Sequence, residues 1–217
     1  MLFPIALSMH PAFAEPDVAH AAALVVEATN RFRAGQGAPP AETQAQLAAT
    51  ARDFAAFMAK TGKFGHEADG SEPTQRARRH GYDYCMVAEN LGYQYRSQGF
   101  KSDAELAESL VAGWKRSPGH RKNLEDREAT QIGVGIARAQ AGRYYAVQVF
   151  GRPASLRVRF EVVNESPRRI DYRVGAESYS LPPRSTRTHE VCGNETVMVH
   201  GQRIAPKNGA RIDASGA

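Results

Sequence analysis

Apolar residues in the first third of the chain recur every three to four positions, the spacing of helices that each bury one face. The first such segment runs from about Ala19 to Arg33 and ends before the glycines and prolines at 35–40. Its apolar positions are Leu24, Val25, Ala28 and Phe32. A second segment starts near Thr43, and Lys60 followed by Gly62 is typical of a helix end. Its apolar positions are Leu47, Ala51, Phe54 and Met58.

The pattern then alternates between short helices and strands. His66 lies in a polar loop at 65–71, and a short basic helix follows and ends at Gly81. Residues 84–93 read as a strand that carries Glu89. Ser102 and Glu105 form a capping box that starts a further helix. The buried side of this helix is predicted to hold Leu106, Leu110 and Trp114.

His120 is predicted to lie in the first turn of a short helix. Ser117 suits the N-cap of this helix and Pro118 its first helical position. Residues 130–138 and 143–151 follow as two strand-like runs joined by a short turn, which indicates an antiparallel hairpin. The chain therefore combines helices with a sheet.

The pattern changes near Pro153. Short alternating runs separated by Asn, Pro and Gly fill residues 156–199 and indicate a β module without helices. We therefore expect one α+β domain over 15–151, a small all-β module over 152–205 and a flexible tail over 206–217. From Arg152 onward the chain holds eleven Lys or Arg against seven Asp or Glu, so this part carries a net charge of +4 out of +5. Either it binds an anionic surface or it is a soluble module with a basic exterior.

Composition narrows the class of protein. Charged residues make up 24% and hydrophobic residues 42% of the 217 residues, which excludes a disordered chain. No apolar run approaches the roughly 20 residues of a transmembrane helix. Residues 1–14 are apolar and end in Ala12-Phe13-Ala14, like a signal-peptide remnant that lacks its basic start. We expect a secreted or periplasmic protein. Cys85 and Cys192 either form a disulfide or remain two separate thiols.

Three residues carry the candidate chemistry: His66, Glu89 and His120. Imidazole and carboxylate groups together bind a divalent cation such as zinc, or calcium or magnesium, and they transfer protons near neutral pH. Each residue also has an ordinary structural explanation as a loop, strand or helix-start residue. The basic cluster Arg76, Arg78 and Arg79 is interpreted as a solvated helix face and not as a nucleic-acid site, because no aromatic residues alternate with it.

The order of these motifs resembles the CAP superfamily, also called SCP/TAPS, which includes cysteine-rich secretory proteins, antigen 5 and plant pathogenesis-related proteins. The resemblance covers about 19–151, and the run from Trp114 to Arg121 looks like the bacterial branch. The matching features are Asn30 and Arg31, the helix from Leu47 to Met58, His66, Glu89-Asn90-Leu91, Trp114, Gly119-His120, and Ile132-Gly133-Val134-Gly135.

The resemblance implies an α-β-α sandwich around an antiparallel sheet, and a cavity with two histidines and two acidic residues that can bind a divalent ion. His66, Glu89 and His120 match three of these four positions, and Ser117 stands at the fourth. Two imidazoles and one carboxylate suffice as zinc ligands and leave a position open for water. A hydrolase would still need a general base, for which Glu67 and Asp69 are the nearby candidates.

We therefore expect an extracellular or envelope binding protein that uses this cavity for a divalent cation or a small ligand such as a lipid, glycan or peptide. The alternatives are a metal-dependent hydrolase acting on peptides or envelope components, with Glu89 as ligand or base, and a protein-interaction module without a ligand. A Ser117/His120 hydrolase is not favoured, because no GxSxG turn surrounds the serine and helix capping explains it.

Overall fold

The computed structural model describes residues 15–216, so the predicted signal-peptide remnant at 1–14 lies outside the described residues. Five helices and four strands form the first domain. They are α1 (Val18–Gly35), β1 (Glu42–Thr43), α2 (Ala45–Thr61), α3 (Pro73–Arg79), β2 (Tyr84–Gln94), α4 (Asp103–Arg116), α5 (Pro118–Glu125), β3 (Gln131–Arg138) and β4 (Tyr144–Pro153). The helices, strand and hairpin predicted from the pattern of apolar residues are confirmed.

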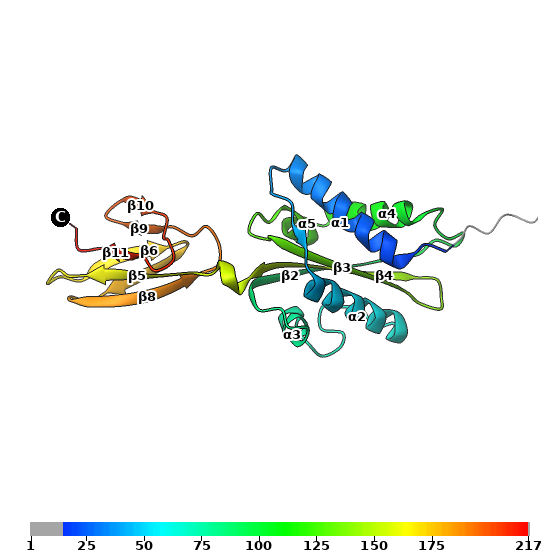
Figure 1. Ribbon diagram of the computed structural model, residues 1–217, viewed down its shortest axis with the longest axis horizontal. Helices are drawn as coiled ribbons and strands as arrows, with labels where there is room; N and C mark the ends of the chain where they lie inside the picture. The colour runs from blue at the N-terminus through cyan, green and yellow to red at the C-terminus, as the bar shows by residue number, and fades with distance from the viewer. Residues whose placement is uncertain (1–14, 217) are drawn as a thin grey trace, which may run out of the picture.

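The domain has three layers. A sheet in the order β1-β3-β4-β2 lies between α1, α4 and α5 on one face and α2 and α3 on the other (Figure 1). Strands β2, β3 and β4 run antiparallel, while the short β1 pairs in parallel with β3. Two separate hydrophobic cores fill the two sides of the sheet. The expected α-β-α sandwich is confirmed, and β2 is an edge strand of its sheet.

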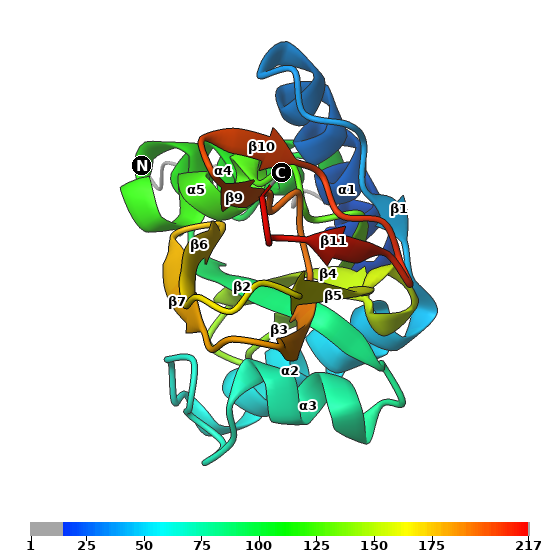
Figure 2. The same ribbon diagram turned by 90° about the vertical axis from the view of Figure 1, so that its left-hand side faces the viewer.

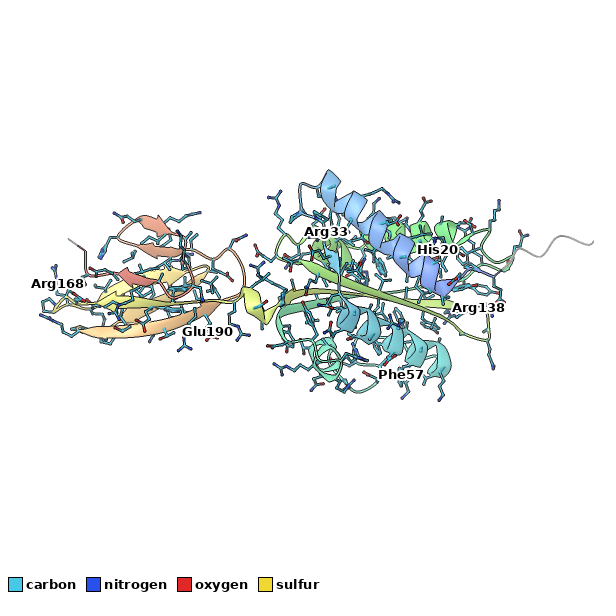
Figure 3. All side chains as sticks on the ribbon, viewed as in Figure 1. His20, Arg33, Phe57, Arg138, Arg168 and Glu190 are labelled. Carbon is cyan, nitrogen blue, oxygen red and sulfur yellow. A yellow bond between two sulfur atoms is a disulfide. The ribbon has the colours of Figure 1, made fainter. Side chains whose placement is uncertain are left out.

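The end of α1 is fixed by polar side chains. Asn30 donates its amide to the carbonyl of Ala41 and accepts from the amide of the same residue. Arg33 is fully buried, and its guanidinium donates to backbone carbonyls of four residues. These acceptors are Pro39, Leu124, Asp126 and Ala129. Arg33 therefore joins the loop after α1 to the end of α5 (Figure 3).

The predicted capping box at the start of α4 is half formed. The Ser102 hydroxyl accepts from the Glu105 amide at 3.2 Å, as expected. The Glu105 carboxylate, however, accepts from the Lys101 amide and pairs with Arg96. A nearby guanidinium competes for the carboxylate that would otherwise return to the N-cap amide.

The remaining chain forms a β module that continues from β4 through the short helix η1 (Ala154–Leu156). Its strands are β5 (Val158–Asn164), β6 (Ile170–Val174), β7 (Glu177–Leu181), β8 (Ser185–Val191), β9 (Val197–Val199), β10 (Gln202–Ile204) and β11 (Arg211–Asp213). They form two sheets, β10-β9-β6-β7 and β11-β5-β8, which enclose a separate apolar core. Figure 2 shows this module facing the viewer.

The end of the chain differs from the flexible tail expected at 206–217. Strand β11 pairs in parallel with β5, and both Ile212 and Ala214 are buried in the core of the module. The short run is polar on average, so its sequence resembled a tail. One buried isoleucine and a ladder of backbone hydrogen bonds are enough to order it.

A disulfide joins the two parts of the chain. Cys85 in β2 is bonded to Cys192 in the segment between β8 and β9, with a Cα–Cα distance of 5.4 Å. Of the two alternatives left open by the sequence, the paired one is present. Asn194 also donates to the Glu128 carboxylate of the first domain. Over residues 15–216, no helix has both the length and the apolar character needed to cross a bilayer.

Candidate functional site

His66 and Glu89 meet at the edge of the central sheet. Gly62 ends α2 in the left-handed conformation, and the following turns place His66 beside β2. Its Nδ1 lies 2.8 Å from Oε1 of Glu89. A carboxylate only accepts hydrogen bonds, so the proton of this contact is on Nδ1. The Glu89 side chain is 1% exposed and that of His66 is 51% exposed. The buried carboxylate therefore orients an imidazole that faces solvent.

Arg76 lies beneath Glu89 and is the residue that the sequence interpretation missed. Its NH2 group donates to both carboxylate oxygens, at 2.9 Å and 3.0 Å. Its side chain is only 3% exposed, so the expectation that Arg76 shares a solvated face with Arg78 and Arg79 is wrong for this residue. Glu89 could have pointed to this role of Arg76 in the sequence, because a carboxylate inside a sheet-helix interface needs a cationic partner.

The two terminal nitrogens of the Arg76 guanidinium are held by several groups, while its Nε is buried without a hydrogen-bond partner among the described residues. NH1 donates to Oδ1 of Asp69 at 2.8 Å and to the carbonyl of Ser71 at 2.6 Å, while NH2 also donates to the carbonyl of His66 at 2.8 Å. The ring of Phe54 lies 3.6 Å from the guanidinium carbon. Arg76 thus fixes the loop that carries His66 as well as the carboxylate that orients its ring.

His120 approaches from the opposite layer. It occupies the first turn of α5, as predicted, and its carbonyl accepts a hydrogen bond from the Asn90 side chain at 3.2 Å. Asn123 of the same helix donates to the Glu89 carbonyl at 3.2 Å and to Asn90 Oδ1 at 2.8 Å. These contacts fix α5 against β2, with α3 on the other side of the strand (Figures 1 and 2).

The two histidines differ in protonation. The hydrogen bond to Glu89 raises the pKa of His66 above 6.5. Burial lowers the pKa of His120 below 6.5, and the charge of His66 lowers it further. The second effect requires the two rings to be near each other. The two pKa values are therefore shifted in opposite directions, and protonation is favoured more at His66 than at His120.

Two members of the predicted cation set, Glu89 and His66, are engaged with other groups. Glu89 directs both oxygens to Arg76 and one also to His66, and the raised pKa of His66 favours its protonated form, which does not bind metals. Among residues 15–216, no group of three or more His, Cys, Asp or Glu is arranged to hold a metal ion. In this conformation both Glu89 oxygens are engaged by Arg76, and the cation set of His66, Glu89 and His120 stays a prediction.

The structure also describes the other catalytic candidates, Asp69, Glu67 and Ser117. Asp69 is bonded to Arg76 and lies 3.4 Å from Arg79, so its carboxylate is engaged. Glu67 is exposed in the turn that follows His66. Ser117 occupies the N-cap position of α5, yet its side chain makes no capping hydrogen bond. The described contacts include no hydrogen bond between Ser117 and His120, so the geometry offers no serine–histidine pair.

The family of this fold follows from a match over most of the first domain. The family model CAP, the cysteine-rich secretory protein family, matches residues 26–150, which is more than half of the chain. The chain belongs to the CAP family. The predicted resemblance to bacterial CAP proteins is thereby confirmed, and His66, Arg76, Glu89 and His120 all lie within the matched segment.

Bacterial proteins are among those similar to this CAP protein. YkwD of Bacillus subtilis (strain 168) is 30% identical over 129 residues, which cover 59% of this chain and 46% of that protein. The chain thus spans about half of the length of this relative. An outer surface protein from Borrelia burgdorferi has a TM-score of 0.55 at 18% identity, covering 63% of this chain and 96% of that structure.

An extracellular protein with an SCP domain from Bacillus anthracis str. Ames has a TM-score of 0.52 at 23% identity, covering 62% of this chain and 41% of that structure. Both structural likenesses support the fold of the first domain. The structural neighbours are thus outer-surface or extracellular CAP proteins.

Proposed function

We propose that this CAP protein is a secreted or periplasmic binding protein that holds an anionic group of a small ligand, such as the carboxylate of a peptide or glycan, against the His66 imidazolium. One observation carries the proposal: Glu89 binds Nδ1 and raises the pKa of the ring, while Nε2 has no hydrogen-bond partner among residues 15–216. A half-exposed charged donor of fixed orientation is suited to an anionic acceptor.

His120 supplies the second contact in this proposal. Its lowered pKa leaves the ring neutral near pH 7, so it can donate from one nitrogen and accept at the other. The neutral His120 ring would add no second positive charge beside a carboxylate bound to His66. It could instead form a hydrogen bond with a hydroxyl or amide group of the same ligand. The pair therefore favours a ligand that carries both a carboxylate and a neutral polar group.

Binding is favoured over hydrolysis because two of the carboxylates near the site are engaged, while Glu67 is exposed. Glu89 and Asp69 both pair with Arg76, and a general base must be able to reach and accept a substrate proton. The separated pKa values of the two histidines are the observation on the side of catalysis, since such a separation is typical of acid–base pairs. A hydrolase, either metal-dependent or using the two histidines as an acid–base pair, is therefore the second candidate.

Calorimetric titration with N-acetylated dipeptides tests the proposal, using the free acid and its C-terminal amide as paired probes. We expect the acid to bind more tightly than the amide. Replacing His66 with Gln should weaken binding of the acid roughly tenfold, the worth of one charge-assisted hydrogen bond. His20→Gln is a matched control, because His20 forms a similar pair with Asp103 at the exposed start of α1, at 2.7 Å.

The same experiments also distinguish the proposed binding function from hydrolysis, the second candidate. Equal affinity for the acid and the amide would contradict the proposed anion site. An equal loss of affinity in His66→Gln and His20→Gln would also contradict it. Cleavage of the dipeptide that requires added zinc and stops with a chelator would replace the binding function by hydrolysis. Tight zinc binding lost in His66→Ala and His120→Ala would restore the predicted cation set.

A further inference from the structure

Exposed aromatic side chains gather at one end of the sheet, away from the β module. Phe64, Tyr93 and Tyr95 are 47%, 49% and 58% exposed, and among the described residues only one other large hydrophobic side chain is comparably exposed. Phe64 meets Tyr93 edge-on at 5.2 Å between ring centroids, and both rings lie within 6.2 Å of Tyr145. We call Phe64, Tyr93, Tyr95 and Tyr145 the aromatic shelf.

A cavity of about 920 Å³ adjoins this shelf and shares Tyr95 and Tyr145 with it. Three cationic side chains line the cavity, Lys60, Arg138 and Arg143, and no Asp or Glu belongs to its lining. Arg138 marks this end of the molecule in Figure 3, opposite the β module. The cavity is therefore positively charged and bounded by aromatic rings.

The cations differ in how they are held. The guanidinium of Arg143 stacks over Tyr93 at 4.7 Å and donates to the hydroxyl of Tyr145 at 3.1 Å, which fixes it between two aromatic rings. Arg138 pairs with Glu15 at 2.9 Å. Lys60 is exposed at the last turn of α2. Arg143 thus presents an oriented, solvent-exposed fork at the mouth of the cavity.

We propose that the aromatic shelf and its cavity form a second binding site, distinct from the His66 site, that takes an acidic oligosaccharide. The C–H faces of sugar rings carry partial positive charge and pack against the electron-rich faces of aromatic rings. A guanidinium binds a sugar carboxylate through two parallel hydrogen bonds. Tyr95 in the cavity lining supplies a face, and Arg143 supplies the carboxylate contact.

The observations favour a short acidic glycan over a nucleic acid or a lipid. The volume lies in the range of sites for compact ligands, roughly 300–1,000 Å³. Single-stranded nucleic acids need a positively charged groove that follows several phosphates. The cavity lining combines five alanines with Thr61, Gln140 and the three cations, and burying these three charged side chains against a lipid chain would be costly.

Calorimetry with a galacturonic acid tetramer tests the proposal on the full chain. Maltotetraose serves as the neutral glycan and a thymidine oligonucleotide as the competing polyanion. We expect the acidic tetramer to bind more tightly than both. Arg143→Ala and Tyr95→Ala should each weaken it about tenfold, and Arg143→Lys less, because lysine keeps the charge without the fork.

Arg52→Ala is the matched control, since Arg52 is exposed on the same helix as Lys60 but outside the cavity lining. An equal loss of tetramer affinity in Arg52→Ala would show that net charge explains the effect, and it would overturn the proposed site. So would tighter binding of the oligonucleotide or equal binding of maltotetraose. Loss of tetramer binding in His66→Gln without loss in Arg143→Ala would move the ligand to the His66 site. Unchanged unfolding midpoints are required of all variants.

Discussion

At the scale of single residues, the histidine site is organised by a buried arginine. Arg76 neutralises Glu89, and Glu89 in turn keeps the proton on His66. A carboxylate charge that is only 1% exposed is costly to bury without a cation nearby. The protonation of the exposed histidine therefore depends on an ion pair that solvent does not reach.

The first prediction concerns Arg76. Arg76→Ala leaves the Glu89 carboxylate buried without its partner and also removes contacts to the loop carbonyls, so we expect the free energy of unfolding to fall by about 3–5 kcal/mol. Urea denaturation followed by circular dichroism measures this loss. Arg79→Ala is the control, because Arg79 is mostly exposed and should cost at most about 1 kcal/mol. Similar losses in the two variants would show that the buried pair has no special role.

The second prediction concerns the protonation of the histidines. In NMR titrations we expect His66 to titrate above pH 6.5 and His120 below it. Glu89→Gln should lower the pKa of His66, because an amide oxygen stabilises the imidazolium less than a carboxylate does. If the pKa of His66 is unaffected by Glu89→Gln, the hydrogen bond does not control the charge of the ring.

This shift also sets a pH dependence of stability. Because the folded state raises the pKa of His66, the pair stabilises the fold fully below the unfolded pKa of 6.5 and loses this contribution as the pH rises through the folded value. The difference in unfolding free energy between wild type and His66→Gln should therefore shrink as the pH rises above 6.5. A difference that grows with pH would contradict the assigned direction.

Single residues were the least predictable scale from sequence. His66, Glu89 and His120 were singled out because imidazole and carboxylate groups can bind a cation or transfer protons, and because the three residues matched a family motif. Arg76 is followed by Arg78 and Arg79 in a helix of seven residues, so its local pattern indicates a solvated face. Only the contact of α3 with β2 makes one of the three arginines a buried ion-pair partner.

At the scale of elements, the contact between α2 and β3 determines how the first domain closes. Gly133 and Gly135 face α2, and a Cβ atom at either position would overlap the helix backbone, at Leu47 and Ala48 or at Ala51 and Arg52. The strand was predicted from its alternating pattern, and its glycines were read as part of a family motif. Their physical role is to permit close approach of a helix backbone.

The third prediction tests this contact. Gly135→Ala should lower the free energy of unfolding by about 2–3 kcal/mol, because the helix and strand must separate to admit the methyl group. Gly119→Ala is the matched control, since no atom lies within 4 Å of a Cβ at that helical position. It should be neutral or slightly stabilising, by up to about 1 kcal/mol. Chemical denaturation of both variants measures the difference, and an equal effect would rule out close packing as the cause.

Element boundaries followed from sequence where apolar periodicity and glycine stops coincide, as in α2 with its C-cap Gly62. The sequence did not predict elements whose order depends on a partner far along the chain. Strand β11 contains one buried isoleucine among polar residues, and its pairing with β5 bridges about fifty positions. No local pattern records such a pairing, because the stabilising contacts form only after the rest of the module has folded.

At the scale of the whole molecule, the CAP domain and the β module form an extended pair joined at one junction (Figure 1). The chain passes through η1, and the Cys85–Cys192 bridge provides a second covalent connection between the two parts. Sequence alone left this pairing open, because two cysteines are compatible with either state. A bridge is consistent with an oxidising compartment, as the proposed location requires.

The fourth prediction concerns this bridge. It spans 107 positions, so the Cys85→Ser/Cys192→Ser variant frees a large loop in the unfolded chain and should lose about 2–5 kcal/mol of stability. Calorimetric unfolding measures the loss, and wild type treated with a reductant should match the variant. Trypsin cleavage after Arg157, close to the junction, gives an independent readout. The nicked wild type should migrate as one species on a non-reducing gel and as two after reduction, because the bridge holds both pieces. Separation without reductant would show that Cys85 and Cys192 are not bonded in solution.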